Sequence, residues 1–192
     1  MLPPVSYENR KLNGRNTMIF NVTSAERCPS HALGLCQLSK KECYAMKAER
    51  LYPQSRAFRK RQTEWWDEDG DLLAFLYALK PGIEYFRYSE AGDFRHQVDV
   101  DKMTVVCDLL SEARGVKCYG YTKRVDLRLD GLNKASNVIL GEHEKEGFST
   151  AKVIPRKANA PEGWHLCPGK NCMVDCAYCA TERGGRVALK KR

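Results

Sequence analysis

Short runs of β-branched and aromatic residues alternate with helical segments along most of this 192-residue chain. Such alternation is typical of βαβ units, in which helices join parallel strands and pack on the sheet. The strand-like runs are TMIFNVTS from Thr17, IEYFRYS (83–89), VKCYGYT (116–122), NVILG (137–141), TAKVIP (150–155) and RVALK near the end. The pattern predicts an α/β fold with about six mainly parallel strands, in a sheet that is open or curled into a partial barrel.

Helical patterns fill the intervals between these runs. Residues 43–66 read as a helical stretch that is broken near Pro53, and DLLAFLYAL (71–79) precedes a Lys-Pro-Gly stop signal. Residues 99–113 place apolar side chains on one helical face, at Met103, Val106, Cys107 and Leu110. In parallel sheets connected by helices, catalytic and ligand-binding residues lie on loops at the carboxyl ends of the strands.

The domain organisation follows from the same pattern. Residues 1–16 are polar and contain two prolines, so we expect a loosely held lead-in. We expect residues 1–163 to form a partial βα barrel that carries an N-terminal three-cysteine loop. Residues 164–192 are expected to form a cysteine-rich C-terminal extension, packed on the same domain.

Composition limits the setting in which the protein works. No apolar run approaches the ~20 residues that span a bilayer, and the N-terminus lacks the apolar centre of a signal peptide. We therefore expect a cytoplasmic protein with no membrane partner, in the host-cell cytoplasm if the source is viral. The formal charge of +8 makes a nucleic acid or nucleotide partner plausible, although this excess of positive charge is modest for the chain length.

Nine cysteines are present, an odd number that excludes complete internal pairing. In a reducing compartment, clustered cysteines are typical of metal ligands or catalytic groups. The first group follows the first predicted strand with the spacing C-x7-C-x6-C and comprises Cys28, Cys36 and Cys43. Cys107 and Cys118 lie within a predicted helix and strand, where core packing is the favoured interpretation.

The second group occupies the tail, with the spacing C-x4-C-x3-C-x2-C, at Cys167, Cys172, Cys176 and Cys179. Four thiolates suit tetrahedral zinc or an iron–sulfur cluster, and the single uninterrupted run favours a cuboidal 4Fe-4S cluster, with zinc as the alternative. Three ligands leave one iron of such a cluster open, whereas four close it. The two groups therefore indicate one or two clusters, the first reactive and the second supporting.

The ordered set CPS–C–CYA, FRYSEAGDF, YGYTKR and the CP–C–C–C tail resembles a family of phage proteins, the gene-product-eighty-eight family. The resemblance extends from about Asn16 to Arg192. It implies an architecture and a viral source, because the family's activity is not established.

The layout is more distantly similar to radical S-adenosylmethionine enzymes. That resemblance implies a cluster on Cys28, Cys36 and Cys43, S-adenosylmethionine as a cofactor held near residues 89–93, and an electron donor if the protein is catalytic. The sequence departs from that superfamily in its loop spacing, which there is C-x3-C-x2-C. Here the tight spacing occurs in the tail, between Cys172 and Cys179.

Two further segments follow predicted strands. In the turn Ser89-Glu90-Ala91-Gly92-Asp93, the two carboxylates could hold a ligand ammonium or sugar hydroxyl, or could cap a turn around Gly92. The segment Tyr121-Thr122-Lys123-Arg124 could clamp an oxyanion or phosphate, or could present ordinary surface cations.

Histidines and a basic stretch complete the candidates. His31 and His165 lie close to cysteines and could substitute as ligands, whereas His96 and His143 carry no stronger signal. The basic segment 56–61 is followed at once by acidic residues, which favours a solvated helix face over a phosphate-tracking surface.

The sequence and these resemblances thus favour an iron–sulfur protein on a radical-SAM-like scaffold, which either modifies a nucleotide or nucleic acid or retains only the scaffold and clusters. The alternative is a zinc- or cluster-stabilised binding module that contacts nucleic acid or a host protein.

Overall fold

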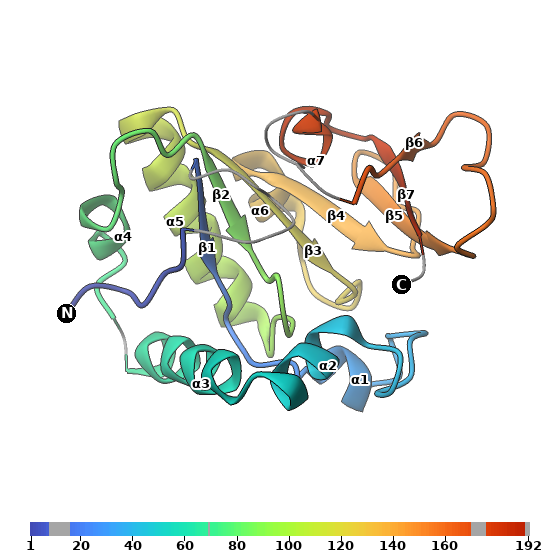
Figure 1. Ribbon diagram of the computed structural model, residues 1–192. Helices are drawn as coiled ribbons and strands as arrows, with labels where there is room; N and C mark the ends of the chain where they lie inside the picture. The colour runs from blue at the N-terminus through green and yellow to red at the C-terminus, as the bar shows by residue number, and fades with distance from the viewer. Residues whose placement is uncertain (8–15, 69, 170–175, 191–192) are drawn as a thin grey trace.

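The computed structural model describes residues 1–7, 16–68, 70–169 and 176–190 (Figure 1). A seven-stranded sheet, parallel throughout, runs through the molecule in the order β1-β2-β3-β4-β5-β7-β6. The strands are β1 (Thr17–Phe20), β2 (Tyr85–Tyr88), β3 (Lys117–Thr122), β4 (Asn137–Gly141), β5 (Ser149–Ile154), β6 (His165–Leu166) and β7 (Arg186–Lys190).

The first five strands lie side by side in chain order, without the reversal that creates a crevice in doubly wound sheets. The sheet does not close, since β1 and β6 form its two edges. The predicted α/β class and parallel sheet are confirmed. An antiparallel bridge between Ser6 and Ile19 covers part of the β1 edge.

The helices are α1 (Pro29–Ala32), α2 (Tyr44–Leu51), α3 (Pro53–Asp67), α4 (Ala74–Tyr77), α5 (Gln97–Arg114), α6 (Asp130–Ala135) and α7 (Tyr178–Thr181). Pro53 begins α3 and so divides the predicted stretch 43–66 into two helices. α5 ends at Arg114 and is followed by Gly115, whose φ of 65° is a left-handed conformation that glycine adopts without strain. Within the described residues, none of the helices is long and apolar enough to cross a membrane.

One face of the sheet packs against α3, α4, α5 and α6. Side chains alternate along each strand, so β1 sends Met18 and Phe20 to this face and Ile19 to the other. Aromatic rings fill the interface, and Phe20 lies 5.1 Å from Phe75 between ring centroids. Cys107 and Cys118 are buried in this core, which confirms the packing role expected of them.

The opposite face holds a smaller cluster around Tyr119, Ile139 and Val187, against which α7 packs. The tail supplies two strands of the same sheet, because β7 pairs with β5 and β6 pairs with β7.

The connection between β4 and β5 is shorter than parallel pairing usually requires, at residues 142–148. The register explains it, because Ser149 pairs with Ile139 in the middle of β4. After β4 the chain therefore returns only as far as the middle of β4 before β5 begins, and β5 extends beyond the end of β4.

The described part of the lead-in is firmly attached, and the expectation of a loose segment is wrong for residues 1–7. The Tyr7 hydroxyl donates to the carbonyl of Ala78, and Gln62 Nε2 donates to the carbonyl of Pro4. Ala78 and Gln62 are distant in sequence from residues 1–7, so local composition could not reveal these contacts.

Candidate functional site

The predicted cofactor residues lie at the carboxyl edge of the sheet. Because the strands are parallel, the loops that follow β1, β2, β3 and β4 all leave at this edge. Figure 1 shows α1 and α2 below the sheet, on the side toward which β2 runs. This edge brings together the cysteine loop after β1, the turn 89–93 after β2 and the segment 122–124 after β3.

Asp93 joins these three loops. Its side chain is buried and accepts hydrogen bonds from the hydroxyls of Ser30 and Thr122, each 2.6 Å long. The backbone N–H groups of Phe94 and Lys123 donate two more. Burial raises the pKa of Asp93, and the hydrogen bonds from Ser30 and Thr122 offset only part of that rise. A carboxylate has about four acceptor positions, and protein groups donate to all of those of Asp93. The Asp93 carboxylate therefore fixes the positions of the three loops.

The rest of the 89–93 turn is also held by protein groups. The Tyr44 hydroxyl donates to the backbone carbonyl of Glu90, and the Glu90 carboxylate lies 3.8 Å from Arg59. Gly92 has a φ of 69°, and a Cβ there would lie 2.2 Å from the carbonyl oxygen of Thr23. Only glycine fits this position, because the backbone of the neighbouring loop leaves no room for a side chain.

Cys28, Cys36 and Cys43 are neighbours along the cysteine loop. Cys28 directly precedes α1 and Cys43 directly precedes α2. Burial raises the pKa of Cys28 to about 12, and the charges of Asp93 and Cys36 add to the rise. The pKa of Cys36 is raised by burial and, more weakly, by Cys43. Each thiol therefore lies close enough to the next to act on it electrostatically.

These three thiols do not form a ready site for a single ion. Among the residues that the structure describes, no group of three or more Cys, His, Asp or Glu side chains is arranged to hold one metal ion. The three cysteine side chains are half-buried, on a loop whose intervening residues are mostly exposed.

Charged groups from other loops surround Cys36. Lys123, which follows β3, lowers the pKa of Cys36, whereas Glu142, which follows β4, raises it. The Lys123 side chain packs against Gly141, and a Cβ added at Gly141 would lie 2.9 Å from the Cγ of Lys123. Burial and the cations of Lys40 and Lys123 lower the pKa of His31, and its buried Nε2 has no hydrogen-bond partner within the described ranges.

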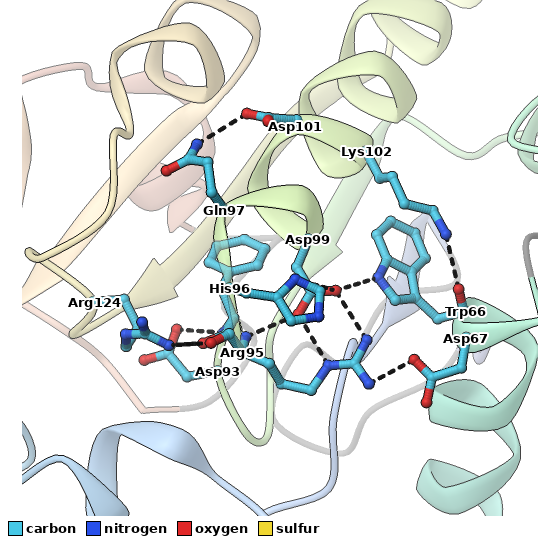
Figure 2. A network of polar contacts seen from close by, with 11 residues as sticks. Trp66, Asp67, Asp93, Arg95, His96, Gln97, Asp99, Asp101, Lys102 and Arg124 are labelled. Carbon is cyan, nitrogen blue, oxygen red and sulfur yellow. Dashed lines mark hydrogen bonds and ion pairs between the residues drawn. The ribbon is translucent and has the colours of Figure 1, made fainter.

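Arg124, the last residue of segment 121–124, is held by protein groups. The Arg124 guanidinium is buried, bonds the carbonyls of Phe94 and Arg95 and forms a bidentate pair with Asp126. Figure 2 shows Arg124 beside a second network, in which Arg95 pairs with Asp67 and Asp99. Of the two predicted clamp cations, Lys123 remains next to the cysteines.

Of the tail cysteines, Cys167 and Cys179 pack on the sheet face opposite α5. The buried Cys179 Sγ lies 2.9 Å from the Tyr121 hydroxyl, and Cys176 Sγ lies 3.1 Å from His165 Nε2. Burial and the neighbouring Cys179 raise the pKa of Tyr121 well above its ordinary value. The backbone of Cys167 bonds β7, whereas Cys172 lies outside the described residues.

Two residues of this region were missed by sequence reasoning. Ser30 looked like part of a loop, although its position two residues after Cys28 was a usable signal. Arg87 lies inside the aromatic run YFRY, where a lone cation in a buried strand was the signal.

The fold and the site together define an open, parallel α/β protein with a cysteine-bearing loop at the carboxyl edge of its sheet. The family model for gene product 88 matches residues 5–146, and the chain belongs to this phage gene-product family. The matched region contains the first cysteine group and segments 89–93 and 121–124, and it ends before the tail cysteines. Searches of curated proteins and of solved structures find no match for this chain.

Proposed function

We propose that the protein holds an iron–sulfur cluster on Cys28, Cys36 and Cys43 and uses it in radical-SAM-like modification of a nucleotide or nucleic acid. The observation that carries the proposal is the grouping of three neighbouring thiols at the carboxyl edge of a parallel sheet. In open and closed βα sheets alike, this edge is where ligands bind.

The protein groups around the thiols fit this role. The raised pKa of Cys28 keeps that thiol protonated at neutral pH, so cluster assembly would release protons. The nearby Lys123 favours the thiolate of Cys36. Asp93 fixes Ser30, in the loop between Cys28 and Cys36, against the segment after β3.

Such a cluster, when bound, would pass one electron from an external donor to S-adenosylmethionine and cleave a carbon–sulfur bond of its sulfonium. The chain's own residues would exclude water and orient the ligand. The Lys123 ammonium is a cation at this edge that could contact a ligand carboxylate or phosphate.

Anaerobic reconstitution tests the proposal directly. With iron and sulfide, we expect about four irons per chain for one cluster and about eight for two, with absorbance near ~400 nm typical of iron–sulfur charge transfer. Cys36→Ser is expected to abolish the first cluster, whereas Cys107→Ala, a substitution in the core, should leave the iron content unchanged. Dithionite and S-adenosylmethionine should then yield 5′-deoxyadenosine, and an intact cluster without this product would contradict radical chemistry.

A second candidate function has a specific observation in its favour. In the tail, His165 Nε2 contacts the sulfur of Cys176, and mixed histidine–cysteine sets are typical of structural zinc. A zinc-stabilised module that binds nucleic acid would be colourless and contain zinc after purification. Its DNA affinity would fall steeply with salt.

A further inference from the structure

Arg87 is a buried cation on β2, the strand next to the β1 edge of the sheet. It is the third residue of β2, pairs in register with Ile19 on β1 and Tyr119 on β3, and is 6% exposed. Its sequence neighbours Phe86 and Tyr88 face the helical core, so Arg87 faces the opposite side of the sheet.

One donor of the buried guanidinium, Nε, has no hydrogen-bond partner among the described residues. Within the described part of the chain, no carboxylate lies within ion-pair distance of the Arg87 side chain. The nearby carboxylate of Glu90 pairs with Arg59 instead. The ring of Tyr121, 5.7 Å from the guanidinium carbon, provides a cation–π contact.

Burial alone would lower the pKa of Arg87, but neighbouring Tyr119, Tyr44 and Glu90 outweigh burial and raise it. The Nε donor nevertheless stays unpaired within the described residues. A buried ion without a partner loses its hydration, and a cation–π contact restores only part of that loss. Arginine is always charged in proteins, so Arg87 cannot escape the cost by releasing a proton. Its planar donors match the two oxygens of a carboxylate or phosphate.

Ser89 and Thr23 add independent signs of a ligand. Both hydroxyls are buried at the carboxyl ends of β2 and β1, and neither has a hydrogen-bond partner among the described residues. Ser89 also has a φ of 52°, a left-handed conformation that is strained for residues other than glycine. Strain of this kind clusters at ligand-binding positions.

We infer that Arg87, assisted by the hydroxyl of Ser89, binds an oxyanion group of a ligand, a carboxylate or a phosphate, on this face of the sheet. The inference goes beyond the proposed function because it requires no cluster. Tyr121 connects the proposed anion site to the tail cysteines, because its ring contacts Arg87 and its hydroxyl contacts Cys179.

Thermal unfolding of the full chain tests the inference. The protein is titrated with inorganic phosphate, with acetate, and with chloride at matched ionic strength. At ten times the dissociation constant, we expect phosphate or acetate to raise Tm by about 3–6 °C more than chloride does. The more effective anion identifies whether the ligand group is a phosphate or a carboxylate.

Variants assign the effect to Arg87. Arg87→Met should fold, because Ile19 and Tyr119 provide apolar neighbours, and it should lose the anion-specific shift. Arg87→Lys keeps the positive charge but loses the planar pair of donors, so it should bind the anion several-fold more weakly. Arg114→Met, at the exposed end of α5, is the matched control and should respond as the unaltered protein does.

The inference is overturned if the unaltered protein gives the same Tm in all three salts, or if Arg87→Met retains the anion-specific shift. Repeating the titration on Cys36→Ser separates this result from the fate of the cluster proposal. That variant should still respond to the anion even if neither protein binds iron.

Discussion

The Ser30 hydroxyl donates a 2.6 Å hydrogen bond to the carboxylate of Asp93, 63 residues farther along the chain. Through this bond the cysteine loop after β1 is fixed to the turn after β2. Thr122, at the end of β3, donates to the other oxygen of the same carboxylate. One buried side chain therefore sets the relative positions of three loops at the candidate site.

Asp93→Asn should destabilise the protein by about 2–3 kcal/mol, because the amide nitrogen cannot accept and leaves a buried donor unpaired. Urea unfolding measures the change. Ser30→Ala is the smaller perturbation and should cost about 1 kcal/mol. The double variant should lose less than the sum, because both changes remove the same bond. A loss below about 0.5 kcal/mol for Asp93→Asn would show that the loops do not depend on it.

Asp99 predicts a pH dependence of stability. Its buried carboxylate accepts hydrogen bonds from Trp66 and Arg95 (Figure 2). Burial alone would raise the pKa of Asp99, but the hydrogen bonds outweigh it and leave the pKa below its ordinary value of 3.8. The resulting stability is full above that value and is lost as pH falls through the folded pKa.

Asp99→Asn should therefore cost about 3 kcal/mol near neutral pH and less as pH falls below the ordinary carboxyl pKa of 3.8. Unfolding free energies at several pH values test this. Asp108→Asn, on the exposed face of the same helix, is the control and should change the unfolding free energy at neutral pH by less than about 0.5 kcal/mol. A pH-independent cost for Asp99→Asn would rule out the assigned ionisation.

Gly92 and Gly34 form a matched pair with φ values of 69° and 68°. Alanine at Gly34 meets no heavy atom within 4 Å and should cost about 1 kcal/mol from the left-handed backbone alone. Alanine at Gly92 meets the Thr23 carbonyl and should cost about 2 kcal/mol more, because the backbone must shift. Equal losses by chemical unfolding would argue against the close approach of these two loops.

The Cys28 thiol should react slowly with alkylating reagents when no metal is bound. With its pKa raised to about 12 by burial, its thiolate fraction, and with it the alkylation rate, should rise about tenfold per pH unit from pH 8 to 10. Peptide mapping after timed alkylation measures the rate at this cysteine alone. A rate that levels off near pH 9 would mean that the thiol is not buried as described.

Local patterns predicted the elements well where one strand or helix carries its own signal. The runs NVILG and RVALK coincide with β4 and β7, and the predicted helix 99–113 corresponds to α5 at Gln97–Arg114. Alternating apolar residues and terminal glycine act within a few residues, so they are readable without the fold. The two-residue strand β6 has too few residues to show any period, and sequence reasoning missed it.

The candidate site divides in the same way. The sequence alone placed three cysteines after a strand and an acidic turn after the next, because those features are consecutive in the chain. Tertiary structure decided that the Asp93 carboxylate accepts hydrogen bonds from Ser30 and Thr122. It also decided that Arg87 is buried between Ile19 and Tyr119 on the neighbouring strands, and that the sheet stays open. Hydrogen-bond partners and burial depend on which distant segments meet in space, and composition and spacing do not contain that information.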